Sequence, residues 1–226
     1  HMGAICFSES DAREPTLSFL RRLGVTSGGR MLRVYAIGED ASENTRWAAK
    51  LMEALKAAEV SPGRTSLSIL SEDESEAEAL QSAGERYGYG SVFASERHAL
   101  SARLLTSVWP VGRFMTFDKS ARAAEDFDAL IVGFGKTGQA VLRSLIMNGQ
   151  FEGSRFHATV IDLDHRRDAG SFFSRCSALR DNYSIDYLDA DAHSVEAFER
   201  LSEIAPKLNY AVISAGTEAE NGKIAS

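Results

Sequence analysis

The chain has 226 residues, of which 44% are hydrophobic and 25% charged, as is ordinary for a folded globular protein. Its net charge of −7 argues against a nucleic-acid partner held by a basic surface. There is no secretory signal and no apolar run near the roughly 18–20 residues that cross a bilayer, and the two cysteines, Cys6 and Cys176, lie far apart. We therefore expect a cytoplasmic protein without a disulfide framework or a metal site.

Short β-rich runs alternate with helical patterns along the chain, which predicts an α/β protein with largely parallel sheets. The helical segments have apolar residues three or four apart, as at Leu17, Leu20 and Leu23. The predicted strands are 4–7, 32–37, 66–70, 91–94, 129–132, 157–161, 184–188 and 210–213. We expect Rossmann-like parallel sheets with helices on both faces, arranged in two related halves.

An internal repeat relates the two halves. Each series contains an Asp-Ala pair, a helix ending in Phe and Arg-Leu, a strand, and a Glu-Asn pair. The first series runs from Asp11 to Asn44 and the second from Asp191 to Asn221. The halves are then out of phase: the first begins in the middle of a Rossmann unit, and the second begins at the opening of one. This pattern indicates that the chain is part of a longer protein with tandem Rossmann units. The alternative is a single chain with this order of elements.

The stretch 118–126 (DKSARAAED) is polar, has no apolar face, and marks the boundary between the halves. We predict that 3–117 forms the second half of a Rossmann unit without a glycine turn. Residues 126–226 are predicted to form a Rossmann NAD-binding unit.

The second half carries a G-x-G-x-x-G turn at Gly133, Gly135 and Gly138, between an apolar strand and a helical pattern. The first glycine permits the tight turn, the second lets a pyrophosphate approach the backbone, and the third lets the helix pack on the strand. The helix start offers N–H groups and a positive dipole end to the phosphates. The alternative is a tight turn in a fold that has lost its ligand.

Asp162 ends the next strand, near the spacing at which a carboxylate accepts the ribose hydroxyls. It favours NAD over NADP because it would repel a 2′-phosphate, whereas His165, Arg166 and Arg167 would receive one. Basic residues that open a helix are more often merely solvated. NAD(H) is therefore the expected cofactor, with ATP, ADP or AMP as alternatives.

Several segments resemble the RCK (regulator of potassium conductance) or TrkA-N family. In the second half these are VGFGKTG from Val132, VIDLD from Val160, LDADAHS from Leu188 and VISAGTEAEN from Val212. In the first half they are AIGEDASEN from Ala36, SLSILSEDESEAEAL from Ser66 and SVFASERHALSARLL from Ser91. The resemblance covers most of the chain, but the first half lacks a glycine turn, so it implies one complete nucleotide site.

The resemblance implies a cytoplasmic regulatory domain that binds a nucleotide and controls a potassium channel or transporter. It also implies assembly into a homodimer or a larger ring, and the apolar run Leu104, Leu105, Val108, Trp109 and Val111 is a candidate contact surface. Phosphates, ribose and adenine would then be held by the predicted site residues. These are Gly133, Phe134, Gly135, Lys136, Thr137, Gly138, Asp162, Leu163, Asp164, Asp189, Asp191, Ala215 and Gly216.

No catalytic constellation is visible in the sequence. His98, His157, His165 and His193 are scattered, and His157, at the start of a buried strand, is better explained as a histidine whose hydrogen bonds are satisfied in the fold. An acidic set at strand ends in the first half would bind a cation or, more simply, solvate loops. It comprises Glu39, Asp40, Glu43, Glu72, Asp73, Glu74 and Glu76. The alternatives to a regulatory domain are an NAD-dependent oxidoreductase fragment and a ligand-free structural Rossmann module.

Overall fold

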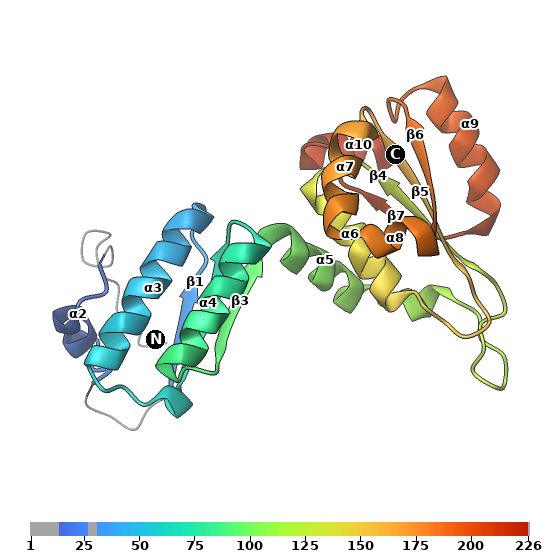
Figure 1. Cartoon of the computed structure of the whole chain (residues 1–226). Helices are drawn as coiled ribbons and strands as arrows, with labels where there is room; N and C mark the ends of the chain where they lie inside the picture. Colours follow the sequence, from blue (N-terminus) through green and yellow to red (C-terminus); the bar gives the residue numbers. More distant parts are fainter. Residues whose placement is uncertain (1–13, 27–30, 226) are drawn as a thin grey trace, which may run out of the picture. The chain divides into compact units, whose positions relative to one another are not determined.

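A computed structural model of the chain describes residues 14–26 and 31–225, and Figure 1 shows the course of the chain. The strand predicted at 4–7 and the Asp11-Ala12 pair lie outside the described residues. The chain forms two compact units, which divide between Arg97 and His98. Each unit contains a parallel sheet with helices packed on it.

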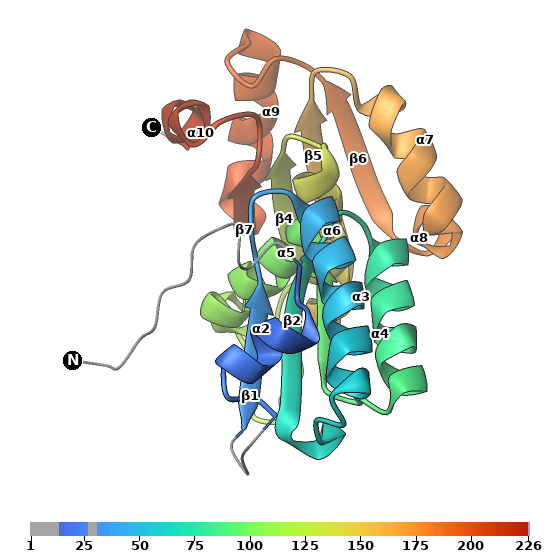
Figure 2. The ribbon, with the colours of Figure 1, turned by 90° about the vertical axis from the view of Figure 1, so that its left-hand side faces the viewer.

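The first unit has a three-stranded parallel sheet in the order β1-β2-β3. Parallel neighbours need a crossover connection, and a helix follows each of the first two strands. The helices α2, α3 and α4 lie on the same face of the sheet (Figure 2). The elements are α2 (Leu17–Arg22), β1 (Leu32–Ala36), α3 (Ala41–Ala57), the 3-10 helix Pro62–Arg64, β2 (Thr65–Ser71), α4 (Glu74–Tyr87) and β3 (Val92–Glu96).

The helix-covered face of this sheet forms the core of the first unit. Buried and half-buried residues alternate along β2, which is the period of a strand with one buried face. Leu67 and Ile69 share a buried cluster with Leu51 of α3. On the opposite face, Tyr35 and Phe93 are 63% and 60% exposed.

The second unit has a four-stranded parallel sheet in the order β6-β5-β4-β7. Counted from the strand before the glycine turn, this order is 3-2-1-4, that of the first four strands in a Rossmann sheet. The predicted α/β fold with Rossmann-like parallel sheets is therefore confirmed. The elements are α5 (Arg97–Val108), the 3-10 helix Val111–Phe114, β4 (Phe127–Val132), α6 (Lys136–Asn148), β5 (Phe156–Asp162), α7 (His165–Arg175), α8 (Ser177–Asn182), β6 (Ser184–Asp189), α9 (Val195–Ile204), the 3-10 helix Ala205–Lys207, β7 (Leu208–Ile213) and α10 (Glu218–Ala225).

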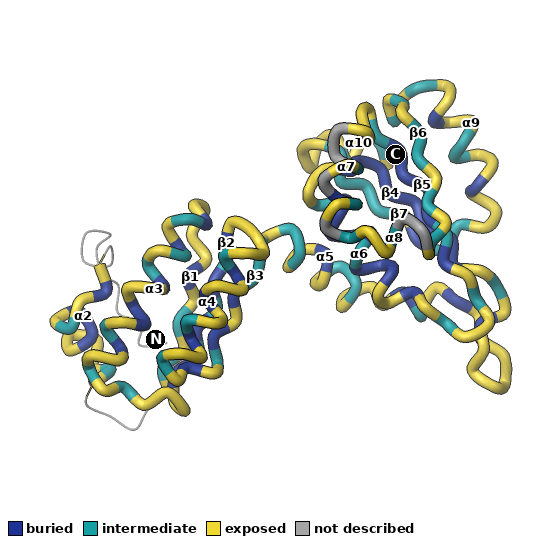
Figure 3. Tube along the Cα trace, in the orientation of Figure 1, coloured by how far each residue is buried: buried dark blue, intermediate teal, exposed yellow. Residues whose placement is uncertain are grey.

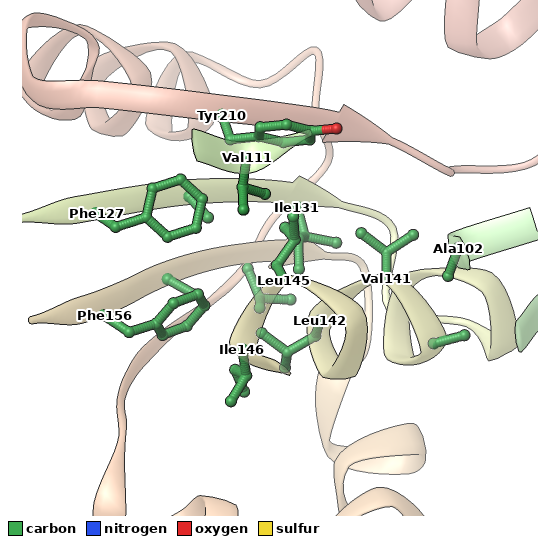
Figure 4. Close-up of a cluster of buried hydrophobic side chains, with 14 of the residues drawn as sticks. Ala102, Val111, Phe127, Ile131, Val141, Leu142, Leu145, Ile146, Phe156 and Tyr210 are labelled. Carbon is green, nitrogen blue, oxygen red and sulfur yellow. The ribbon is translucent and has the colours of Figure 1, made fainter. Parts of the chain in front are cut away.

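β4 is an inner strand of this sheet and is buried along its whole length (Figure 3). Phe127 and Ile131 belong to the core on the α6 side, which Figure 4 shows in close-up. Leu130 and Val132 belong to a second core, to which Ala197 of α9 contributes. Helices therefore cover both faces of β4, which explains why its sequence is a nearly continuous apolar run.

The division at residue 97 differs from the boundary inferred from the polar stretch 118–126. The difference is α5, which follows β3 directly along the chain but packs with the second unit. Ala102 is 2% exposed in the α6-side core, and Thr106 Oγ1 lies 3.1 Å from Ser144 Oγ of α6. No pattern within α5 itself indicates this partner.

His157 of β5 contacts the two neighbouring strands, β4 and β6, at the amino-terminal edge of the second sheet. Its Nδ1 lies 3.1 Å from Asp128 Oδ1 of β4, and its Nε2 lies 3.3 Å from Asp186 Oδ2 of β6. Asp128 also pairs with Lys207 at 3.3 Å. His157 thus has hydrogen-bond partners in the fold, as the sequence analysis preferred, and lies at the edge opposite the glycine turn.

No helix within residues 14–26 and 31–225 is both long and apolar enough to span a membrane.

Candidate nucleotide-binding site

The glycine turn joins β4 to α6, and two of its glycines are required by the fold. Gly133 has a φ of +91°, and a Cβ there would lie 2.7 Å from the backbone nitrogen of Ala215, which follows β7. A Cβ at Gly138 would collide with the carbonyl oxygen of Gly133. These glycines therefore allow β4, α6 and the end of β7 to meet.

Gly135 differs from the other two glycines because its surroundings are open. No described atom lies within 4 Å of the position that a Cβ would occupy there, and the residue is exposed. Its φ of −64° and ψ of −172° are open to any residue. The fold therefore does not require a glycine at this position. A ligand that approaches the backbone here would require one, because a side chain would block it.

The α6 helix begins at this open position. Gly135 is its N-cap, and no side chain caps the helix terminus. The first N–H groups of a helix have no partner within the helix, and the helix dipole adds positive potential at this end. Lys136, the first helical residue, is exposed. The terminus is thus suited to an anion such as phosphate.

Asp162 links the end of β5 to the glycine turn. Its Oδ2 accepts a hydrogen bond of 2.6 Å from the Phe134 nitrogen, and its Oδ1 accepts one of 3.0 Å from the Asp164 nitrogen. A carboxylate has about four acceptor positions, so these two bonds leave capacity for ribose hydroxyls. Asp162 therefore has a structural role in addition to its predicted role in binding.

A cavity of about 350 Å³ opens beside Asp162 at the carboxyl ends of the strands. This is the edge where open α/β sheets bind their ligands. Six of the predicted site residues line it, and they come from segments that follow four different strands. They are Gly133, Asp162, Leu163, Asp191, Ala215 and Gly216.

Two further acidic groups shape this cavity. Asp191 accepts a hydrogen bond of 2.9 Å from the His193 nitrogen, which fixes its loop. Glu220 accepts hydrogen bonds from the backbone nitrogen and the hydroxyl of Thr217, at 2.7 and 2.9 Å. These bonds, the one from the backbone first, lower the pKa of the Glu220 carboxyl below its ordinary value. The cavity is therefore lined by anionic acceptors, whereas the helix terminus at Gly135 favours anions.

The remaining predicted residues lie outside the cavity. The Phe134 side chain is 0% exposed and packs edge-on against Phe172 and Tyr187, so it belongs to the core and is not open to a ligand. Asp189 lies 3.7 Å from the Nε of Arg166, which has an 84% exposed side chain. Five others remain: Gly135, Lys136, Thr137 and Gly138 form the turn and the start of α6, and Asp164 donates its N–H to Asp162.

Sequence reasoning did not select several residues that line the cavity, among them His193, Glu220 and Ile224. Glu220 has a recognisable signal, because Thr217 and Glu220 have the Ser/Thr-x-x-Glu spacing of a helix capping box. His193 and Ile224 have no local signal, since only the packing of α9 and α10 brings their segments to this edge.

The acidic set of the first unit consists partly of helix caps. Asp40 accepts from the Glu43 nitrogen at the start of α3, and Asp73 accepts from the Glu76 nitrogen at the start of α4. Glu76 in turn accepts from the Thr45 hydroxyl at 3.0 Å. In the described part of the chain, no group of three or more His, Cys, Asp or Glu residues is arranged to hold a metal ion.

No protein-family model matches the chain, and a search of curated proteins finds no significant relative. The site is therefore interpreted from its geometry and chemistry.

Proposed function

We propose that the second unit binds an adenine nucleotide, NAD(H) foremost and ATP, ADP or AMP as alternatives. The main support for this proposal is that the cavity lies beside the glycine turn. A cavity of about 350 Å³ with Asp162 in its wall adjoins a glycine turn whose middle glycine, Gly135, has open space where a side chain would be. The cavity suits a nucleoside, and the turn suits the phosphates attached to it.

In this proposal the ribose hydroxyls donate to Asp162, and adenine occupies the cavity between Asp191 and the Ala215-Gly216 segment. The phosphates lie over Gly135 against the start of α6. NAD(H) is favoured over NADP(H) because Asp162 would repel a 2′-phosphate. Arg166, one of the basic residues able to offset that repulsion, has an 84% exposed side chain and lies 3.7 Å from Asp189.

We further propose that binding serves regulation, in a cytoplasmic RCK-like domain that controls a potassium channel or transporter. The support for this role is the sequence resemblance, in particular the turn from Val132 to Gly138 and the run from Val212 to Asn221. An NAD-dependent oxidoreductase fragment is the alternative. A ligand-free structural module is less well supported, because such a module would be expected to fill the space at Gly135 with side chains.

Calorimetric titration with NADH, NAD, NADPH, ATP, ADP and AMP tests the binding proposal. We expect NAD(H) to bind and Asp162→Ala to weaken its binding at least tenfold, which corresponds to about 1.4 kcal/mol. The substitution removes the ribose acceptor and also the acceptor of the Phe134 N–H. A melting temperature measured for each variant separates loss of the ligand contact from loss of the fold.

Asp162→Asn is the matched control. The amide keeps one acceptor oxygen for the Phe134 N–H but loses the charge that disfavours a 2′-phosphate. We expect this variant to discriminate less between NADH and NADPH. If the wild-type chain binds none of the six nucleotides, the proposed function is wrong.

We also propose that the chain forms a homodimer through α5. Leu104 and Val108 are 57% and 63% exposed and lie four residues apart, on one face of the helix, with Trp109 49% exposed beside them. Such an apolar cluster is characteristic of an interaction surface. The expected contact run was wrong for Val111, which is 4% exposed in the core, and for Leu105, which packs against that core.

Sedimentation velocity at high micromolar concentration tests this surface. We expect a dimer that Leu104→Glu converts to a monomer, because a charge at the centre of an apolar contact would be desolvated on association. Met147→Glu, at an apolar residue of α6 that is 79% exposed, is the control and should leave the dimer intact. A wild-type chain that sediments as a monomer would contradict the proposal.

A further inference from the structure

The helix α5 brings a histidine to the phosphate side of the glycine turn. The Nδ1 atom of His98 lies 2.7 Å from the Oγ1 atom of Thr137, and both residues are half-buried. Thr137 is the second residue of α6, next to the open position at Gly135. The cavity lined by Asp162 lies toward the other end of the turn, so the pair lies where phosphates would extend away from the nucleoside.

Two further residues of α5, Ala102 and Thr106, contact the rest of the second unit. Ala102 lies one turn after His98 and is 2% exposed in the shared core. A further turn along, Thr106 Oγ1 lies 3.1 Å from Ser144 Oγ. His98, Ala102 and Thr106 are spaced four residues apart, so they lie on one face of α5, and that face contacts the rest of the second unit.

The direction of the His98–Thr137 hydrogen bond decides what the threonine is able to offer a ligand. A hydroxyl has a single proton to donate. If Nδ1 of His98 accepts that proton, the Thr137 hydroxyl has none left for a ligand. If Nδ1 instead carries a proton and donates it to Oγ1, the Thr137 O–H is available to another acceptor. A phosphate at the start of α6 is such an acceptor.

We propose that His98 is a positioning residue for the phosphates of the bound nucleotide. It donates from Nδ1 to Thr137 and thereby directs the Thr137 O–H toward a phosphate oxygen. This inference rests on the proposed nucleotide binding and adds a specificity to it, namely a preference for phosphorylated ligands over the free nucleoside. His98 and Thr137 both belong to the second unit.

The test compares dissociation constants for adenosine, ADP and NADH, by calorimetry for the nucleotides and by NMR titration for adenosine. His98→Ala and Thr137→Val should each weaken ADP and NADH binding by roughly five- to tenfold, the loss expected for one hydrogen bond. Adenosine should bind either variant as it binds the wild type. The double variant should be no weaker than either single variant, because both remove the same contact.

Two further variants separate positioning from a purely structural role. His98→Asn offers a side-chain N–H near the place of Nδ1, so it should restore ADP affinity to within about twofold of wild type. His193→Ala, in the wall of the nucleoside cavity, should instead weaken all three ligands by the same factor. If His98→Ala lowers the melting temperature by several degrees, His98→Asn carries the test of His98, and Thr137→Val against Thr137→Ser tests the hydroxyl.

The outcomes are distinct. Suppose that the wild-type chain binds ADP or NADH. If His98→Ala binds these nucleotides as tightly as the wild type, or if it weakens adenosine binding by the same factor as nucleotide binding, the role of His98 is overturned and the proposed function stands. Additive losses in the double variant would also overturn it. If the wild-type chain binds neither ADP nor NADH, the proposed function fails and the role of His98 fails with it.

Discussion

Gly138→Ala should destabilise the second unit by about 2–3 kcal/mol, the upper part of the usual range for an overpacked site. The added methyl group would overlap the carbonyl oxygen of Gly133 and approach Ser214 Oγ to 3.2 Å. Backbone atoms are not able to move aside as a flexible side chain does, so α6 has to shift away from β4. Urea denaturation followed by circular dichroism measures the loss.

Gly170→Ala is the matched control for this substitution. Gly170 lies within α7, and a Cβ there would meet no described atom within 4 Å. Alanine is favoured over glycine in a helix by up to about 1 kcal/mol, so this variant should be slightly more stable than the wild type. Equal effects at Gly138 and Gly170 would contradict the close packing described at the turn.

Gly135→Ala should leave the fold intact but weaken nucleotide binding by more than tenfold, or more than about 1.4 kcal/mol. The backbone angles at Gly135 suit alanine, and the new methyl group meets no described atom. It would, however, occupy the space through which the pyrophosphate approaches the start of α6. Calorimetric titration with NADH and ADP measures the loss, and an unchanged melting temperature shows that it is specific to binding.

The same Gly170→Ala variant serves as the binding control, because it adds a methyl group away from the turn. If Gly135→Ala binds NADH as tightly as the wild type, the phosphates do not lie over this residue. Any site would then be confined to the cavity beside Asp162. If Gly135→Ala instead unfolds the unit, the space described around this residue is wrong.

The strands could be predicted because the pattern of apolar residues along each strand reflects which of its faces are buried. The seven strands expected within the described residues are all present, with ends within a few residues of those predicted. β4 illustrates the reason, because a strand that is buried on both faces is apolar along nearly its whole length. The strand orders, β1-β2-β3 and β6-β5-β4-β7, come from the structure and have no local signal in the sequence.

The binding site could be predicted only in part. Gly133 and Asp162 are predicted because glycines at a turn and an acid at a strand end have a recognisable chemistry, whereas Asp191 is implied by the family resemblance. All three line the cavity. Phe134 was selected along with the turn, yet its side chain lies in the core. The motif specifies the backbone path, whereas the direction of each side chain depends on what packs against it.

The α/β class, the positions of the strands and the turn from Gly133 to Gly138 can be predicted from the sequence, since each depends on residues that are neighbours along the chain. The packing of α5 with the second unit, the contact of His98 with Thr137 and the place of His193 at the cavity are seen only in the folded molecule. These contacts join residues far apart in the sequence. Such contacts depend on how whole helices and strands pack together, and a short stretch of sequence does not show this.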